Sequence, residues 1–476
     1  MSEQPTSHPP KKKALWFAIL VAIYFFVVLV IPKPEAVKPE GWRLVGLFVA
    51  TVAGLILEPI PGGALVLIAV VLSAIIAGQP IHTALAGYGD PTVWLVMAAF
   101  FISRGLINTG LARRIALLFV KTVGHTSLGV CYALSGSDML LASIIPSNGA
   151  RSGGVVLPIV RSIAELYGST PGPKAAMLGM YLYLAVYQGI CVTAAMFFTG
   201  QASNPLAAKI ATDNGYPITW ASWFLAGIVP GICSLLIGPM VVMKMYPPEI
   251  RRTPEASAFA SGELRAMGSM SWNEKVLALV FVCVCGMWVT SDYHKIDIAV
   301  PALLGAGVLL LAGVLKWEDI RSEKSAWDIF IWYGGLVQLG KALNVTGAPK
   351  AFAEGVAAAF HDASWVTLFA IALLIYFYAH YAFASITAHI LAMYPPFLAV
   401  LKAQGAPLGL VAFSFACFTN LAAGLTNYGT TPSPMFFAHE YVPMKAWWKV
   451  GFVMSVVNLA VWSTVGFGWW KLIGYW

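Results

Sequence analysis

The stretch Ile145-Pro146-Ser147-Asn148-Gly149-Ala150-Arg151 determines how the rest of the chain is interpreted. It is a short polar tip between two largely apolar runs, residues 127–145 and 155–163. Neither run reaches comfortably across a membrane, because a spanning helix needs about 20 apolar residues. A polar, non-helical tip at membrane depth is tolerated only where protein or a water-filled cavity surrounds it. The pattern therefore predicts a re-entrant helical hairpin.

A second polar tip, Ala384-Ser385-Ile386-Thr387-Ala388-His389, occurs about half a chain later, between the apolar residues 369–381 and 390–401. Ser147 and Ser385 are 238 positions apart, and the same offset relates Arg151 to His389. Two polar interruptions at repeat-related positions in an apolar chain are typical of the binding site of a membrane transporter.

The composition places the whole chain in a membrane. Of its 476 residues, 59% are hydrophobic and 11% are charged, whereas a soluble domain has roughly 25% charged residues. The mean hydropathy is +0.77. We interpret the chain as an all-α polytopic membrane protein with about eleven transmembrane helices and two re-entrant helical hairpins.

The net charge of +8 does not indicate a nucleic-acid partner, because Lys and Arg gather at segment ends, as at residues 11–13, 113–114 and 251–252. The positive-inside rule explains this distribution. We expect a bacterial inner membrane protein with a cytoplasmic N-terminus. The six Cys lie inside apolar runs without metal-ligand spacing, so we expect no metal site and no cofactor.

The apolar segments predict the order of the spans. The first half contains residues 14–31, 44–57, 64–78, 94–110, 175–198 and 223–245, and the second contains residues 275–290, 300–315, 325–346, 408–425 and 447–475. The hydrophilic loop 246–272 separates the halves. We expect a tail at 1–13, scaffold helices at 14–125 and 273–362, and a transport domain made of 126–245 and 363–476.

Two further polar breaks share the pattern T-x5-P, at Thr199–Pro205 and at Thr426–Pro432. Proline ends a helix, and glycine allows close backbone approach. Arg104, before the first hairpin, corresponds to Lys341 before the second. Because five spans separate corresponding elements, the halves are predicted to be inverted repeats.

The tips and breaks can bind an anion although their hydroxyl, amide and backbone groups carry no fixed charge. Helix N-termini at the membrane midplane attract carboxylates, whereas free carbonyl groups attract cations. Ionisable groups just past a tip, here Arg151 and His389, are candidates for function, although each could instead be a snorkelling or ion-paired side chain. We interpret Arg104 and Lys341 as cations that each pair with an acidic group at an end of the bundle.

These residues also carry a family resemblance. The motifs I-P-S-N-x-A-R-x-G-G at residues 145–154 and H-Y-x-F-A-S-x-x-A-H at residues 380–389, together with the T-x5-P breaks, resemble those of the divalent anion/sodium symporter family. The resemblance covers nearly the whole chain. It is closest to the dicarboxylate exchanger branch, which includes 2-oxoglutarate/malate translocators and citrate or tartrate/succinate antiporters.

The resemblance implies a homodimer that moves small dicarboxylate anions by an elevator-type mechanism. The substrate residues it implies are Ser147, Asn148, Gly149, Thr199, Gly200, Ser385, Ile386, Thr387, Thr431 and Pro432. If transport were coupled to sodium, the implied ligands would be Ser147, Asn148, Ser385 and Thr426.

The chain departs from the family pattern at both tips. Gly149 stands where Thr is usual, and Ile386 stands where sodium-coupled members often have Asn. Those members tend to have uncharged residues where this chain has Arg151 and His389. Our hypothesis is that these two side chains supply positive charge locally, so that transport is sodium-independent, obligatory exchange.

A sodium-coupled symporter is the main alternative. A channel is disfavoured, because pores rarely need paired broken helices. An enzyme is disfavoured because the sequence lacks HExxH, G-x-S-x-G, a P-loop and paired intramembrane carboxylates.

Overall fold

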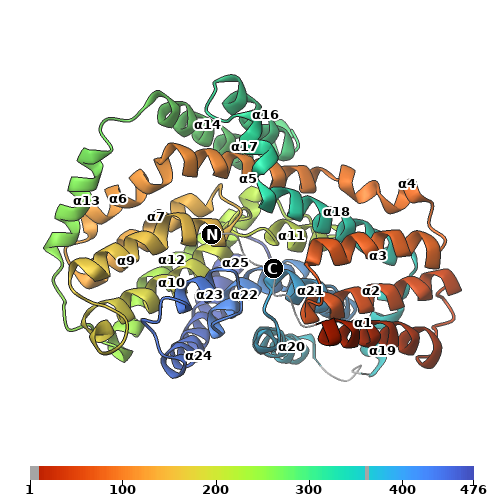
Figure 1. Cartoon of the computed structure of the whole chain (residues 1–476). Helices are drawn as coiled ribbons and strands as arrows, with labels where there is room; N and C mark the ends of the chain where they lie inside the picture. Colours follow the sequence, from red (N-terminus) through yellow and green to blue (C-terminus); the bar gives the residue numbers. More distant parts are fainter. Residues whose placement is uncertain (1–9, 360–363) are drawn as a thin grey trace. The chain divides into compact units, whose positions relative to one another are not determined.

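The computed structural model describes residues 10–359 and 364–476, and over these residues the chain is helical (Figure 1). One isolated bridge, between Thr126 and Arg252, is the only β interaction in this described part. Within these described residues, ten helices are long and apolar enough to cross a membrane. The predicted all-α, multi-pass fold is confirmed.

The chain divides into two compact units. The first unit comprises residues 1–97, 324–372 and 387–407, and the second comprises residues 98–323, 373–386 and 408–476. Each unit therefore draws on both halves of the sequence. The division into scaffold and transport domains stays a prediction.

The first unit holds the N-terminal helices and the start of the second repeat. Its helices are α1 Pro10–Phe25, α2 Pro39–Leu57, α3 Gly62–Ile76, α4 Ile81–Ala84, α18 Lys324–Val345, α19 Ala348–Ala359, and parts of α5 Pro91–Thr109, α20 Trp365–Ala379 and α21 Ile386–Ala403. Helix α2 packs on α1 and α3, and α3 packs on α18. Gly334 of α18 allows the Tyr88 ring to approach, because a Cβ there would lie 2.3 Å from the ring.

The second unit contains both broken helices and the first hairpin. Its helices are α6 Leu111–Val123, α7 Ser127–Ala142, α8 Asn148–Arg151, α9 Leu157–Leu166, α10 Gly179–Met196, α11 Asn204–Asp213, α12 Trp220–Met245, α13 Pro254–Ala266, α14 Trp272–Val289, α15 Ser291–His294, α16 Ala299–Leu311, α17 Trp317–Ser322, α22 Leu408–Ala422, α23 Pro432–Phe437, α24 Met444–Val461 and α25 Phe467–Leu472. Short π segments, Ser152–Val156 and Trp462–Gly466, join α8 to α9 and α24 to α25.

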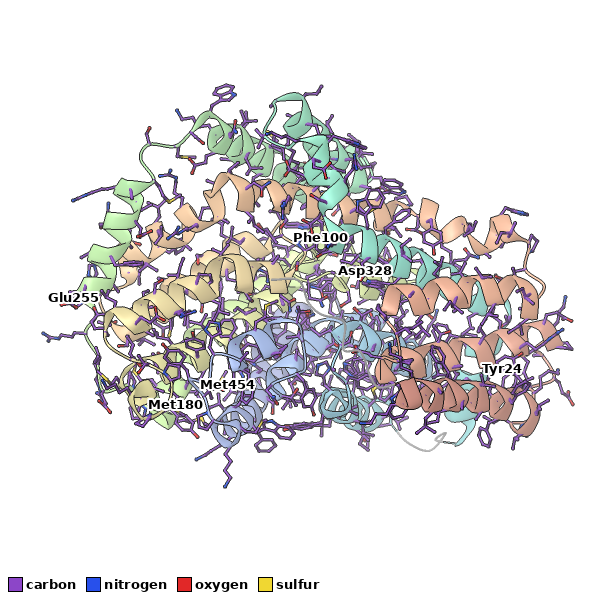
Figure 2. All side chains as sticks on the ribbon, in the orientation of Figure 1. Tyr24, Phe100, Met180, Glu255, Asp328 and Met454 are labelled. Carbon is purple, nitrogen blue, oxygen red and sulfur yellow. The ribbon has the colours of Figure 1, made fainter. Side chains whose placement is uncertain are left out.

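Helix α10 is the centre of the second unit. It packs on α7, α12 and α22, and all of its residues except Met180 are buried. Met180 is labelled in Figure 2, where side chains fill the space between the helices. A helix that is apolar on every side belongs in a core, so the first broken helix is enclosed by protein before it reaches its break.

The non-helical parts of the tips are shorter than the sequence suggested. The Ser147 hydroxyl accepts a hydrogen bond from Ala150 N at 3.0 Å and caps α8, because Ser is a favoured N-cap residue. Residues 148–151 are therefore already helical. Likewise Thr387 and His389 lie in the first turn of α21.

The sequence analysis missed helices without a long apolar run. The segment described as the hydrophilic loop 246–272 contains α13, which packs on α6. Arg114 of α6 donates to Glu274 of α14 at 2.6 Å, and both side chains are buried. The loop is therefore an ordered, helical connection.

Candidate functional site

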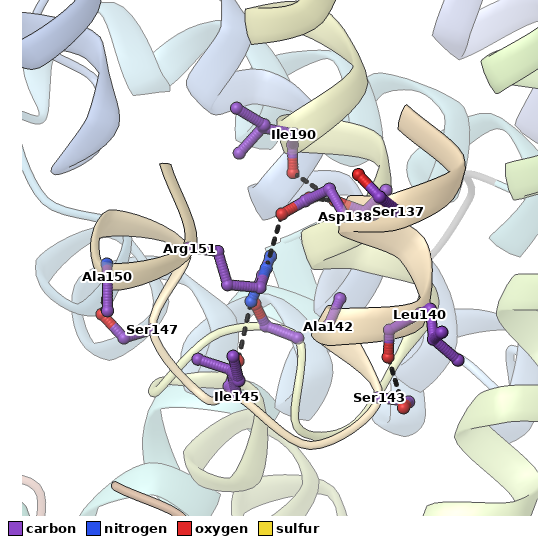
Figure 3. A network of polar contacts seen from close by, with 12 residues as sticks. Ser137, Asp138, Leu140, Ala142, Ser143, Ile145, Ser147, Ala150, Arg151 and Ile190 are labelled. Carbon is purple, nitrogen blue, oxygen red and sulfur yellow. Dashed lines mark hydrogen bonds and ion pairs between the residues drawn. The ribbon is translucent and has the colours of Figure 1, made fainter. Parts of the chain in front are cut away.

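The guanidinium of Arg151 lies between Asp138 and Ile145 of the first hairpin (Figure 3). The side chain is fully buried, with a relative exposure of 0%. Its Nη1 donates to the Ile145 carbonyl oxygen at 2.7 Å and to the Gly200 carbonyl oxygen at 2.8 Å. Arg151 therefore joins the tip of the first hairpin to the break that follows α10.

Asp138 of α7 neutralises this guanidinium. Its Oδ1 accepts from Arg151 Nε at 2.9 Å, and its side chain is 1% exposed. Its other oxygen accepts from the Thr193 hydroxyl of α10. A buried ion pair is stable only with such supporting hydrogen bonds. The pair carries no net charge, although Arg151 Nη2 has no hydrogen-bond partner within the described residues.

Thr199 makes a second connection between the first hairpin and the first break. Its hydroxyl donates to the Ser143 carbonyl oxygen at 2.5 Å and accepts from Trp220 Nε1 at 3.2 Å. Thr199 is 1% exposed. Its hydroxyl therefore holds the backbone of the tip, and it faces protein on all sides.

The first tip contacts the second break directly. Asn148 Nδ2 donates to Thr430 Oγ1 at 2.9 Å. A Cβ on Gly149 would lie only 2.8 Å from Thr431 Cγ2 and 3.2 Å from Thr431 Cβ. The departure from Thr at position 149 thus has a steric explanation, because Thr431 takes the space.

The second break is also bonded to α10. The Tyr187 hydroxyl donates to the Ala423 carbonyl oxygen at 2.8 Å and lies 2.5 Å from the Ser433 hydroxyl. Gln188 donates to the Gly424 carbonyl oxygen at 2.9 Å. Pro432 is the first residue of α23 and is buried. These contacts satisfy carbonyl groups that the break removes from the helix.

The second tip spans the boundary between the units. Ser385 and Ile386 belong to the second unit, whereas Thr387 and His389 belong to the first. Ser385 and Thr387 are partly exposed, while Ile386 and His389 are buried. In the second unit, His380 Nε2 lies 2.9 Å from the Gly429 carbonyl oxygen.

Arg104 and Lys341 each form an ion pair with an acidic residue of their own unit. Lys341 Nζ lies 2.8 Å from Asp90 in the first unit, and Arg104 lies 3.8 Å from Glu323 in the second. Burial on its own would raise the pKa of Asp90, but hydrogen bonds from Lys341 and Thr92 lower it overall. Both cations are therefore ion-paired, and their position at the ends of the bundle stays a prediction.

Sequence reasoning missed Asp138, and gave His380 no role of its own. Asp138 interrupts the apolar run 127–145, and an intramembrane acidic residue is by default a candidate for function. That signal was available. The partner of Asp138 was not, since it depends on how α7 and α8 fold together.

A polar tip capped by Ser147, a second polar tip at residues 384–389, and two helices broken at Thr-x5-Pro are features of a membrane transporter. The chain matches the family described as "Sodium:sulfate symporter transmembrane region" over residues 12–476. It therefore belongs to this family of divalent anion/sodium symporters, as its tips suggested.

Individual relatives agree with this assignment. The chain is 42% identical to "Putative malate transporter YflS" of Bacillus subtilis over the full length of both chains. It is 39% identical to "Dicarboxylate transporter 1, chloroplastic" of Spinacia oleracea, covering 98% of this chain and 82% of that one. The crystal structure of the Alcanivorax borkumensis YdaH transporter has the same fold, with a TM-score of 0.50, 14% identity, and coverage of 98% and 99%.

Proposed function

We propose that this transporter exchanges dicarboxylates such as malate, 2-oxoglutarate or succinate across a bacterial inner membrane, independently of sodium. The printed names of the relatives, a malate transporter and a dicarboxylate transporter, support this substrate class. Charge clusters such as Arg113–Arg114 and Arg251–Arg252 support a cytoplasmic N-terminus by the positive-inside rule.

The observation that carries the proposal is the position of Arg151 Nη1, within 2.8 Å of carbonyl oxygens from both the first tip and the first break. Carbonyl groups freed at a break are the usual ligands of a coupling cation. A guanidinium is permanently charged, so here a fixed side chain takes the place of a mobile cation.

Charge balance gives Arg151 and His389 different proposed roles. Asp138 offsets the charge of Arg151 at 2.9 Å, so the proposed role of Arg151 is to occupy the cation position. His389, buried in the first turn of α21, is proposed to supply positive charge at the second tip. Within the second unit, substrate carboxylates would meet the partly exposed hydroxyl groups of Ser147 and Ser385.

Two parts of the proposal follow from the family. We propose a homodimer, and an elevator-type movement in which both hairpins and both broken helices travel together. The bonds from Asn148 to Thr430 and from Tyr187 to Ala423 support joint movement of the first hairpin with the second break.

A sodium-coupled symporter is the second candidate. The family description includes sodium, and the Thr426 hydroxyl is fully buried without a hydrogen-bond partner among the described residues. A hydroxyl of this kind could serve as a ligand for a hard cation.

Uptake of radiolabelled malate and 2-oxoglutarate into proteoliposomes separates the candidates. The vesicles are loaded with unlabelled dicarboxylate or left empty, with and without external sodium. The proposal expects uptake only into loaded vesicles, at a rate that sodium does not change. Sodium-driven uptake into empty vesicles would establish the symporter instead.

A further inference from the structure

We propose that His380 is the positioning residue of the second hairpin, and that its imidazole holds the carbonyl group freed at the second break. Arg151 makes the equivalent contact at the first break. This inference deepens the proposed exchange function and rests on it.

The contact is between a ring nitrogen and a backbone oxygen. His380 lies in the 3-10 turn His380–Ala382 that ends α20, and it is 0% exposed. Its Nε2 is 2.9 Å from the Gly429 carbonyl oxygen. A carbonyl oxygen only accepts, so Nε2 carries the hydrogen. A buried carbonyl group left without a donor would be costly.

Two oxygens and the His380 imidazole lie close to the same glycine. A Cβ on Gly429 would lie 2.8 Å from the Ala423 carbonyl oxygen, 3.1 Å from Thr426 Oγ1 and 3.2 Å from His380 Nε2. No side chain fits at this position. If the imidazole were removed, an oxygen-lined space would remain, of the kind that hard cations occupy.

A neighbouring hydrogen bond fixes the same alignment of residues 380–381 against residues 428–429. The Tyr428 hydroxyl donates to the Tyr381 carbonyl oxygen at 2.9 Å, so the consecutive residues 380–381 hold the consecutive residues 428–429. The first hairpin is tied to its break in the same way, by Arg151 on Gly200 and Thr199 on Ser143. Each hairpin is thus bonded to its own break through more than one residue.

The sequence repeat hides this correspondence. The offset of 238 positions pairs Arg151 with His389, and both follow their tips. His380 precedes its tip instead. Contacts to the break therefore pair Arg151 with His380, which no alignment of the two tips would suggest.

The test compares two amide variants of different reach in the full-length protein. His380→Gln can place its amide near the position of Nε2, whereas His380→Asn is one methylene shorter. Initial rates of malate exchange are measured in malate-loaded proteoliposomes, with and without sodium. We expect His380→Gln to stay within roughly threefold of wild type, and His380→Asn to lose roughly tenfold, as for a buried acceptor deprived of its donor.

Two further variants complete the test. His380→Ala should lose at least as much sodium-free exchange as His380→Asn, and sodium should restore part of it. His294→Ala is the matched control, because His294 Nε2 also contacts a carbonyl oxygen, that of Met287 at 2.9 Å, at a helix end outside the tips and breaks. It should leave the rate and its sodium response unchanged.

Equal rates for His380→Gln and His380→Asn, or wild-type sodium-free exchange by His380→Ala, would overturn the inference. If His380→Ala fails to fold in size-exclusion chromatography, the Gln and Asn pair decides alone. A sodium requirement in the wild type would contradict the proposed exchange, and His380 would then be judged by the ratios measured with sodium present.

Discussion

Each hairpin contacts a backbone carbonyl group of its own break, but the two contacts differ in chemistry. In the first, a guanidinium paired with Asp138 donates to the Gly200 carbonyl oxygen. In the second, the His380 imidazole contacts the Gly429 carbonyl oxygen. A guanidinium is charged at every physiological pH, whereas imidazole is the side chain whose charge responds to pH near neutrality. The comparison indicates that only the first connection brings a permanent charge, and with it a buried counter-ion.

The largest expected effect follows from removing that counter-ion. Asp138→Asn leaves the Arg151 guanidinium buried and uncompensated, so we expect the protein to lose about 3–5 kcal/mol of stability. Thermal unfolding of the purified protein measures the loss. Glu165→Gln is the control, because its ion pair with Arg161 is about half exposed and should cost at most about 1 kcal/mol. Equal unfolding temperatures for both variants would contradict a charged first connection.

A steric change at the first tip should have the next largest effect. Gly149→Thr restores the usual family residue, but its Cβ would meet Thr431 Cγ2 at 2.8 Å. We expect a loss of about 1–3 kcal/mol from overpacking, and recovery when Thr431→Ser removes that methyl group. A double-mutant cycle on thermal unfolding measures the coupling. Additive effects would show that Thr431 does not explain Gly149.

Thr199 tests the second bond of the first hairpin. Thr199→Val removes the hydroxyl and leaves the Ser143 carbonyl oxygen without this donor. Because the site is buried, we expect a loss of about 1–3 kcal/mol. The measurement is again thermal unfolding, with Thr122→Val as the control, since that hydroxyl is exposed and bonds only within its own helix. Matching losses would mean that burial of the bond is unimportant.

The corresponding bond of the second hairpin should matter least. Tyr428→Phe removes a hydroxyl that donates to Tyr381 O from a side chain that is 36% exposed. Water can replace the lost donor, so we expect a loss of no more than about 0.5–1.5 kcal/mol. Malate exchange and unfolding should both stay near wild type. A larger loss of unfolding free energy for Tyr428→Phe than for Thr199→Val would contradict the expectation that the bond of the first hairpin contributes more to stability.

The sequence predicted the fold class and the family because both depend on patterns that are visible in the sequence itself. Apolar runs, paired tips and T-x5-P breaks are such patterns. Helices α6, α11, α13 and α19 were missed because they are short or amphipathic, and only packing reveals them. The non-helical part of the first tip was predicted to be too long, because Ser147 caps a helix that begins at the next residue, Asn148.

The candidate residues were predicted as a set, without their contacts. Arg151 was selected from its place after the tip, but its partner Asp138 lies 13 positions earlier on another helix. The reason for Gly149 required Thr431, from the other end of the chain. Pairings of this kind depend on how the helices cross, which cannot be read from a single sequence.

The central claim is that the Arg151 guanidinium takes the place of a coupling cation, and Arg151→Thr tests it most directly. The variant would leave the Asp138 carboxylate facing the Ile145 and Gly200 carbonyl oxygens, ligands suited to a small cation. The measurement is malate exchange in loaded proteoliposomes as external sodium is raised. The account predicts little exchange without sodium and recovery as sodium increases, with no sodium response in the wild type. Undiminished exchange by Arg151→Thr in the absence of sodium would contradict it.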